Sequence, residues 1–475
     1  MRIVGLLFIV GFLLSACQSE EGDKQMGESD NELIDIVKIQ DDPDNVLRID
    51  VEVTMKESAT LKLVYWKDGN ESVKRELVFD DQKQSWATKL ILLEEQTKYW
   101  LKVYASNQNG MVEESKPFQF ITKALPDGLM KFTNLMPDYT YTFNGYIHVG
   151  DKQQGTLYLI NAEGKVVWYQ PTDDLSVICS GFDPKTKTFQ AILGFNPNES
   201  FTGEYIYVVD LYGNVKLKKY YAHLDNPYFH HDIQMLDNGD LVVVNQIRQS
   251  FDLTRWGGSS NEMVTGDGFS ILDFSGNTKW TWSAFDFISP EDDPDIMGDR
   301  GEFQYTPRED WLHANTAYPC PDGDFLVSFN RIRQVWKVDG RTGEVIYKLG
   351  RNGDVHLTNP EDFSDRQHAA SLTPDGDVMI YDNGYTNKRS RVMAYRINEI
   401  TKQAEVTMRI VLPKEDFSVN QSSAYCMDND RILFGSVVPK TIGVIDKNGN
   451  LMWHYKTNRP FYRATSNFHS YQSLQ

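Results

Sequence analysis

The chain has 475 residues, a formal net charge of −19, and 24 Tyr, 25 Phe and 10 Trp. The acidic charge argues against nucleic acid and anionic membrane surfaces as partners, so an anionic substrate would need a local positive site. The length exceeds one ordinary compact domain unless that domain is built from repeats. Aromatic residues in a chain without a long helical pattern favour an all-β fold.

The first residues indicate export. Met1-Arg2-Ile3 is a short basic start, Val4–Leu14 is an apolar core, and Leu14-Ser15-Ala16-Cys17 has the form of a lipobox. The apolar core is shorter than the roughly 20 residues of a membrane-spanning helix. Residues 1–16 are therefore predicted to be a lipoprotein signal peptide, with Cys17 as the lipidated first residue of the mature chain. The alternative is an ordinary secretory signal with a chance cysteine.

Residues 17–32 are rich in Glu, Asp, Ser and Gly and are predicted to be an acidic flexible tether. Within the tether, Ser19-Glu20-Glu21 resembles the signal that sends some lipoproteins to the outer face of the cell. We therefore expect a location in the cell envelope, with a lipid anchor in the outer membrane. The sequence leaves open which leaflet of the outer membrane holds the anchor, whether the protein is exposed at the cell surface, and whether it forms a homo-oligomer.

Three cysteines remain in the mature chain besides Cys17, at Cys179, Cys320 and Cys426. Three cysteines cannot form a disulfide framework, and none has Cys-x-x-Cys spacing. Free buried thiols are expected, and a single disulfide is left open.

In residues 33–124, apolar and polar residues alternate as they do in short, half-buried β-strands. Thr60–Trp66 and Thr97–Ala105 place about every second residue on an apolar face, and turns fall at Asp68-Gly69-Asn70 and at Asn107–Gly110. This spacing predicts a small β-sandwich, and the second strand followed by Asn-Gly resembles a fibronectin type III domain. We expect it to serve as a spacer or as a brace against the rest of the chain.

Residues 125–475 follow a boundary at Pro126–Gly128 and contain a repeated hairpin. Each copy has a strand, an acidic or amide turn with Gly, and a strand that ends in an aromatic residue. The six copies are Thr156–Gly164 leading to Trp168, Tyr205–Gly213, Phe269–Gly276 leading to Trp280, Val335–Gly343 leading to Tyr347, the degenerate Val392–Met408, and Ile442–Gly449 leading to Trp453. An inner hairpin lies between consecutive copies, which predicts six four-stranded units and a six-bladed β-propeller. Leu129–Tyr146 either closes a blade or stands apart.

Three of the inner hairpins begin with histidine. They are His231–Asp240, His313–Asp324 and His368–Asp377, each with an Asn-Gly or Asp-Gly turn, the strongest short-range signal for a hairpin. The innermost strand of a propeller blade lines the axial channel. We therefore predict that the three imidazoles occupy one register and meet near one mouth of that channel.

Three interpretations of these histidines are open from the residues alone. They are polar residues in a wet channel, ligands of zinc or iron, or part of a site for an anion. The neighbouring arginines Arg331 and Arg333 would repel a metal cation. Together with Asn315, they favour an anion.

A family resemblance narrows the choice. Asp310–Asn315, Ser328–Arg331 and Arg366-Gln367-His368 resemble the motifs of bacterial arylsulfate sulfotransferases, and the resemblance extends from about Leu129 to the C-terminus. It implies a six-bladed propeller in which a channel histidine takes sulfate from an aryl sulfate and passes it to a phenol, without a nucleotide sulfate donor. Some relatives carry a disulfide near the site, which cannot be placed in this sequence.

By order along the chain, the resemblance implies a role for each site residue. His368 corresponds to the nucleophile, His313, Asn315 and Arg331 to the sulfate-binding group, and His231 to a further histidine of the site. Arg333 competes with Arg331, because residues two apart face the same side of a strand.

The residue types suit sulfuryl transfer, which resembles phosphoryl transfer in its loose transition state with charge on three equatorial oxygens. A neutral imidazole is a competent nucleophile near pH 7, and Arg, Asn and His can stabilise the charge. We predict an aryl-sulfate sulfotransferase that uses a sulfohistidine intermediate, a phenolic sulfate donor and a phenol acceptor, with no cofactor or metal. The alternatives are a non-catalytic propeller lipoprotein that binds a ligand or partner, and a metal-dependent propeller enzyme.

Overall fold

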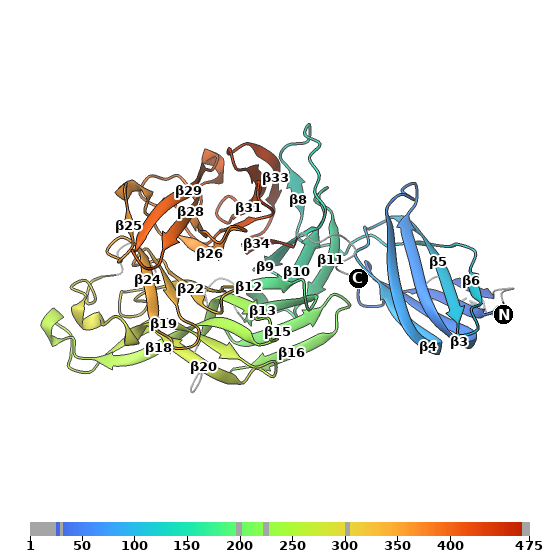
Figure 1. Ribbon diagram of the computed structural model, residues 1–475, viewed down its shortest axis with the longest axis horizontal. Helices are drawn as coiled ribbons and strands as arrows, with labels where there is room; N and C mark the ends of the chain where they lie inside the picture. The colour runs from blue at the N-terminus through green and yellow to red at the C-terminus, as the bar shows by residue number, and fades with distance from the viewer. Residues whose placement is uncertain (1–24, 29–31, 196–201, 222–227, 300–304, 468–475) are drawn as a thin grey trace, which may run out of the picture.

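The computed structural model describes residues 25–28, 32–195, 202–221, 228–299 and 305–467, and this part of the chain is built almost entirely of β-strands (Figure 1). The predicted all-β fold is confirmed. The predicted signal peptide, Cys17 and most of the tether lie outside the described residues. Within them, no helix is long and apolar enough to cross a membrane. The only helices found there are the short 3₁₀ turns η1 (Thr254–Trp256), η2 (Ala284–Asp286), η3 (Pro290–Asp292), η4 (Pro360–Asp362) and η5 (Lys414–Asp416).

The N-terminal part forms one seven-stranded sheet with the order β1-β2-β3-β5-β6, in which β4 pairs with β3 and β7 with β5. Its strands are β1 (Gln25–Glu28), β2 (Ile34–Asp41), β3 (Ile49–Lys67), β4 (Lys74–Leu90), β5 (Lys98–Asn107), β6 (Val112–Glu114) and β7 (Phe118–Ile121). Alternate residues of β5 are buried, as the sequence pattern predicted, and Leu101 and Val103 pack with Leu61 and Leu63 of β3. Register shifts between Thr54 and Leu61 allow the long β3–β4 pair to curl around this core.

Six further sheets each contain four antiparallel strands in a meander. From the innermost strand outward, blade 1 is β34 (Phe461–Asn467), β9 (Tyr146–Asp151), β10 (Thr156–Ile160) and β11 (Val166–Pro171), and blade 2 is β12 (Ser176–Asp183), β13 (Thr188–Gly194), β15 (Tyr205–Asp210) and β16 (Val215–Tyr220). Blade 3 is β17 (Phe229–Met235), β18 (Leu241–Phe251), β19 (Glu262–Leu272) and β20 (Thr278–Ser283), and blade 4 is β21 (Ala314–Pro319), β22 (Phe325–Phe329), β23 (Gln334–Val338) and β24 (Val345–Gly350). Blade 5 is β26 (His368–Leu372), β27 (Val378–Asp382), β28 (Arg391–Asn398) and β29 (Gln403–Val411), and blade 6 is β30 (Ser423–Cys426), β31 (Arg431–Ser436), β32 (Thr441–Asp446) and β33 (Leu451–Thr457). Short strands add to the edges of blades 3, 5 and 6, namely β14 (Thr202–Gly203), β25 (His356–Leu357) and β8 (Phe132–Asn134).

The innermost strands contact one another in the cyclic order β34, β12, β17, β21, β26, β30, so the sheets surround a common axis as propeller blades do. The last strand, β34, pairs with β9 and completes the first blade, which closes the ring. Leu129–Tyr146 does not add a blade. Its strand β8 pairs with the outermost strand of blade 6.

Aromatic residues of the outer hairpins join neighbouring blades. The indole N–H of Trp168 donates to the carbonyl of Leu211 in the next blade, at 2.7 Å. Trp282 and Trp453 make the same kind of bond with the next blade in the ring. The repeated aromatic position thus has a structural cause: each ring fills the space between blades, and its polar atom finds a partner there. In blade 3 the buried residue of this kind is Trp282, two residues beyond the expected Trp280.

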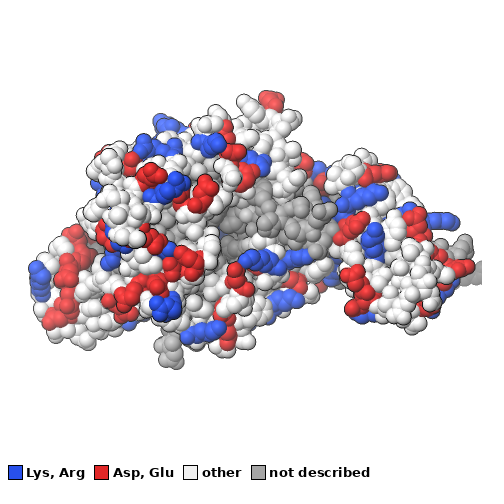
Figure 2. Space-filling view, viewed as in Figure 1, with Lys and Arg blue, Asp and Glu red and all other residues white. Residues whose placement is uncertain are grey.

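The N-terminal sheet packs against blade 1. Asn45 donates to the carbonyl of Tyr169 at 2.7 Å, and Arg48 donates to the Gln170 side chain at 2.8 Å. Ile91 and Leu92 join the apolar cluster around Trp168. On the face shown in Figure 2, cationic and anionic side chains are interspersed over both parts of the molecule.

Candidate functional site

The three predicted histidines lie where the innermost strands of blades 3, 4 and 5 begin. Each strand is irregular there: its pairing shifts register after Phe229 in β17, after Ala314 in β21 and after His368 in β26. His231 and His313 have φ angles of 59° and 57°, and Ala369, beside His368, has 52°. Such bulges turn side chains away from the regular alternation of a strand. The imidazoles do converge, with the ring centroids of His231 and His313 4.8 Å apart.

The three histidines do not occupy one register. His368 lies opposite Tyr381, five residues after the turn Gly376, whereas the carbonyl of His313 accepts from the amide of Asn330, seven residues after Gly323. The hairpin of blade 4 is longer, and His313 lies one pleat further from its turn. The rings are nevertheless close, because His313 lies beside His231 and the charges of His313 and His368 both act on His231.

His313 is part of a charged group. Its Nδ1 lies 2.7 Å from Asp310 Oδ2, and Arg331 Nη2 lies 3.3 Å from the same oxygen. Burial alone would lower the pKa of His313, but the adjacent Asp310 carboxylate outweighs burial and raises it. Burial would raise the pKa of Asp310, yet His313 and Arg331 hold it at about 2. His313 is therefore poised to carry a proton near neutral pH.

Arg331 and Arg333 point to different partners. Besides Asp310, Arg331 donates to the carbonyl of Tyr305 at 3.0 Å, whereas Arg333 Nη1 lies 3.3 Å from Asp365 Oδ1. The two arginines lie in a turn and not in a strand, and Arg333 has a φ of 56°. The alternation rule, which placed both on one side, does not apply in a turn. Arg331 alone joins the histidine cluster.

His231 has a neighbour that the sequence analysis did not select. His230 Nδ1 lies 2.6 Å from His231 Nδ1, and His230 Nε2 lies 3.2 Å from Asp267 Oδ1 of β19. Burial, reinforced by the charges of His230 and His313, lowers the pKa of His231 well below its usual value. His231 is thus neutral at physiological pH. The adjacent His-His pair was the sequence signal for His230.

His368 is buried and neutral. Burial, with smaller contributions from the charges of His313 and Arg463, lowers its pKa to about 3, although Asn383 acts in the opposite direction. Its Nδ1 lies 2.7 Å from Asn383 Oδ1. Asn383 is fully buried at the end of β27, and its Nδ2 donates to the carbonyls of Ser418 and Gln421 at 2.8 and 3.1 Å.

Asn315 and Arg463 lie behind the histidines. Asn315 Nδ2 donates to the carbonyl of Gln367 at 2.9 Å, which fixes the residue before His368. Arg463 of β34 pairs with Asp232 at 2.6 Å and also donates to the carbonyl of Asn315. Arg463 is buried, and Asp232 raises its pKa despite the cost of burial. Arg463 could not be found from the sequence, because nothing local indicates that the last strand returns to blade 1.

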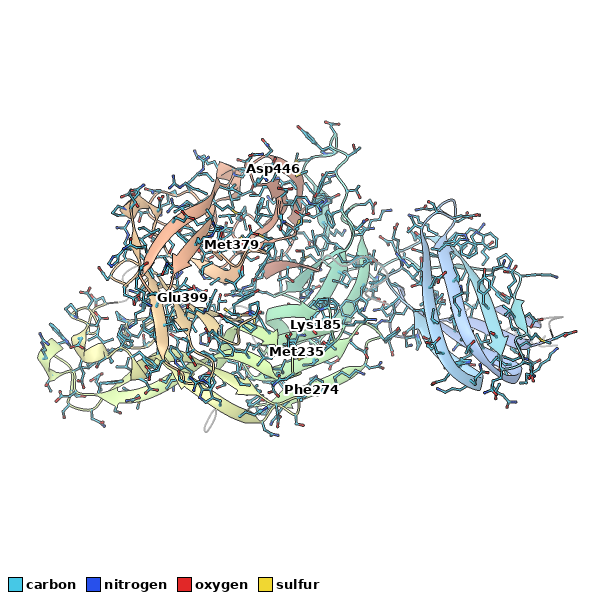
Figure 3. The ribbon with its side chains drawn as sticks, in the orientation of Figure 1. Lys185, Met235, Phe274, Met379, Glu399 and Asp446 are labelled. Carbon is cyan, nitrogen blue, oxygen red and sulfur yellow. The ribbon has the colours of Figure 1, made fainter. Side chains whose placement is uncertain are left out.

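A cavity of about 280 Å³ opens beside His231 and His313 on the side where the innermost strands begin, and His368 is not among the described residues that line it. Its lining includes Tyr228, His230, His231, Arg248, Tyr305 and His313. A second cavity, of about 360 Å³, lies at the opposite end, where Met235 of β17 approaches its turn (Figure 3). Asp232 and Arg463 line the second cavity, so their ion pair separates it from the histidines. No cluster of three His, Cys, Asp or Glu side chains suited to a metal ion occurs among the described residues.

Cys179, Cys320 and Cys426 are free, as expected, and no disulfide joins any two of them. Cys179 and Cys320 are buried, and burial raises the pKa of the Cys320 thiol to about 12. None of them is a reactive thiolate at neutral pH.

A family model described as Arylsulfotransferase (ASST) matches residues 121–442, which run from the last strand of the N-terminal sheet into blade 6. A search of curated protein sequences returns no match. Similar solved structures include a protein of unknown function from Bacteroides caccae, at 9% identity and a TM-score of 0.42, covering 69% of this chain and 100% of that one. A streptogramin B lyase, at 12% identity and a TM-score of 0.36, covers 69% of this chain and 87% of its own. An auxiliary nutrient binding protein from Bacteroides ovatus, at 13% identity and a TM-score of 0.35, covers 86% of this chain and 82% of its own. These similarities are too distant to bear on function.

Proposed function

The chain belongs to the arylsulfotransferase family, since the family model spans more than half of it, and from this premise we propose a specific reaction. The protein moves a sulfonate group from a phenolic sulfate ester to a phenolic acceptor through a sulfohistidine at His368. It uses no nucleotide sulfate donor. The observation that carries this proposal is a neutral, buried His368 in one cluster with a His313 whose pKa is raised by Asp310.

In the first half-reaction, a ring nitrogen of His368 attacks the sulfur of the donor. The N–S bond forms with the nitrogen lone pair, and the S–O bond to the aryl group breaks with its electrons left on the phenolic oxygen. His313 gives its proton to that oxygen, so a neutral phenol departs. In the second half-reaction, His313 takes the proton of the acceptor phenol, whose oxygen displaces the sulfonate from His368.

The remaining groups stabilise charge on the sulfonate oxygens. Arg331 is a fixed cation beside His313, and His231 faces the same space as a neutral imidazole. Each such donor, aimed at charge that grows in the transition state, contributes about 10²–10³ in rate. Asn315 is fully buried and donates to the Gln367 carbonyl, so it acts by positioning His368 from behind. Arg333, which pairs with Asp365, has no direct role in this scheme.

Mass spectrometry of protein quenched after mixing with a chromogenic aryl sulfate, and no acceptor, tests the proposal. We expect one added sulfonate on the peptide that contains His368, ping-pong kinetics with phenols, and loss of both adduct and turnover in His368→Ala. An adduct on His231 or His313 would move the nucleophile to another ring. Sequential kinetics without an adduct would indicate direct transfer. Activity lost on chelation and restored by one metal would favour the metalloenzyme alternative.

A further inference from the structure

The hydrogen bonds of Asn383 determine which of its atoms faces His368. The Ser418 and Gln421 carbonyls, 2.8 and 3.1 Å from Asn383 Nδ2, can only accept hydrogen bonds. The amide nitrogen must therefore face them, because the opposite orientation would place Oδ1 against two carbonyl oxygens. Asn383 Oδ1 then lies 2.7 Å from His368 Nδ1 and can only accept. The proton of a neutral His368 consequently lies on Nδ1.

The two carbonyls are themselves fixed by the loop that leads into blade 6. The Ser418 amide donates to Ser390 Oγ at 3.1 Å, and its hydroxyl donates to the carbonyl of Asn420 at 3.0 Å and accepts from the Val438 amide at 3.1 Å. Gln421 has a φ of 51°, a conformation that a residue with a side chain rarely adopts. Asn383 is thus held by the loop that connects blade 5, which carries His368, to blade 6.

We propose that Asn383 is a positioning residue that locks His368 in the Nδ1–H tautomer and so leaves the lone pair on Nε2 for attack on sulfur. The inference rests on the proposed function only for its catalytic consequence, since the tautomer is a property of the protein alone. An imidazole in water prefers the other tautomer, with the proton on Nε2. Without Asn383, His368 would therefore spend most of its time with Nε2 blocked.

The sequence pattern supports an amide at this position. Asn383 is seven residues after the turn Gly376, and Asn330 and Gln246 occupy the same place after Gly323 and Gly239. The three hairpins that bring the histidines to the axis thus each carry an amide at this position, within β18 in blade 3 and directly after β22 and β27 in blades 4 and 5. Of these three amides, Asn383 has a side-chain contact with the proposed nucleophile, at 2.7 Å from His368 Nδ1.

Three variants separate the tautomer lock from a merely structural role. Asn383→Ala removes the acceptor. Asn383→Asp keeps an oxygen beside Nδ1 but sets its second oxygen against the Ser418 and Gln421 carbonyls, and its carboxylate, once ionised, makes His368 more basic. Asn245→Ala is the matched control, because it deletes another buried amide with hydrogen bonds to Ser270 and the Gln246 carbonyl.

The first measurement is the tautomer of His368, read from two-bond ¹H–¹⁵N correlations in ¹⁵N-histidine-labelled protein and assigned by loss of the signal in His368→Ala. We expect the Nδ1–H pattern in the unaltered protein, in Asn383→Asp and in Asn245→Ala, and a shift toward Nε2–H in Asn383→Ala. An Nε2–H pattern in the unaltered protein, or an unchanged pattern in Asn383→Ala, would overturn the proposal.

The second measurement is the single-turnover rate of sulfonation with an aryl sulfate. We expect Asn383→Ala to slow it by about 10–100-fold, by analogy with the loss of a group that orients a metal-ligating histidine. In Asn383→Asp the rate should rise with pH, because the more basic His368 is protonated and unreactive below its pKa. The charges of His231, His313 and Arg463 also act on His368. If no donor sulfonates the unaltered protein but the Nδ1–H pattern is present, the proposed function fails and the lock stands. If Asn383→Ala does not fold, a flat pH profile in Asn383→Asp overturns the catalytic role.

Discussion

At the scale of single residues, the site combines two histidines in opposite states. His368 is neutral because burial outweighs its hydrogen bond to Asn383, and His313 is disposed to protonation because the Asp310 carboxylate outweighs burial. One site can supply both a nucleophile and an acid when the surroundings of two neighbouring groups shift their pKa values in opposite directions. The role of each ring is therefore set by its partner, and not by histidine itself.

Asp310→Asn should remove the charge that keeps His313 protonated. The acid form of His313 exists below its pKa, so the rate with a poor phenolic leaving group should fall as pH rises through that value. In the variant this fall should move to lower pH, and the rate near neutral pH should drop by about 10²-fold. Profiles of kcat/KM against pH for two aryl sulfates test this. An equal loss for a nitrophenyl donor, which needs little protonation on leaving, would contradict the role of His313 as the acid.

Arg331→Ala should slow turnover by about 10²–10³-fold, since Arg331 lies beside His313 and can stabilise the sulfonate charge. Arg333→Ala should lose far less, because Arg333 pairs with Asp365 outside the cluster. The comparison requires only steady-state kinetics of the two purified variants. A larger loss of activity in Arg333→Ala than in Arg331→Ala would show that Arg333 binds the sulfate.

At the scale of elements, the innermost strands are made irregular where the chemistry lies. Five of the six shift register within their pairing, those of blades 1 to 5. A regular strand would alternate its side chains between the two faces of a blade. The shifts allow adjacent residues, such as His230 and His231, to contact each other and the cavity together.

The closing strand β34 contributes the ion pair of Arg463 with Asp232 beneath the site. Removing one partner of a buried ion pair leaves an uncompensated charge, so Arg463→Met should lower the free energy of unfolding by about 3–5 kcal/mol. Denaturant unfolding measures this loss. Lys185→Met serves as the comparison, because the pair of Lys185 with Asp237 is exposed and should leave the unfolding midpoint unchanged. Equal unfolding midpoints for the two variants would show that the buried ion pair contributes no more to stability than the exposed one.

At the scale of the whole molecule, an acidic chain holds its cations at the axis. The net charge is −19, yet Arg463 is buried on the innermost strand β34 and Arg331 lies beside His313 in the turn after β22. An anionic substrate would be repelled by the overall charge and attracted only within the cavity. Such a local field favours small anions over extended polyanions.

Cys17→Ala should abolish lipidation, because Cys17 alone follows a lipobox in the sequence. The unlipidated protein should partition into the aqueous phase of a detergent separation and keep its sulfotransferase activity, since the N-terminal sheet and the blades do not depend on the anchor. Partitioning is followed by immunoblot of the two phases. Undiminished recovery in the detergent phase would contradict the proposed outer-membrane anchor.

The sequence by itself determined the features that depend on near neighbours. Alternating apolar residues and Asp-Gly or Asn-Gly turns predicted the all-β fold, and the topology has as many four-stranded sheets as the predicted hairpin pairs. The same hairpins identified His231, His313 and His368 as a converging set. These signals are local, because strand alternation and turn geometry are settled within a few residues.

The tertiary structure alone decided which groups those histidines meet. Arg463 reaches Asp232 across 231 positions of sequence, and Asn383 is oriented by carbonyls 35 and 38 positions away, in the loop between blades 5 and 6. The structure distinguishes Arg331 from Arg333, because both lie in a turn and their side chains pair with different carboxylates, Asp310 and Asp365. Closure of the ring brings distant residues within hydrogen-bond distance, and no periodicity in the sequence encodes that distance. The histidines could therefore be found from the sequence, whereas their protonation states are set by contacts that only the closed propeller creates.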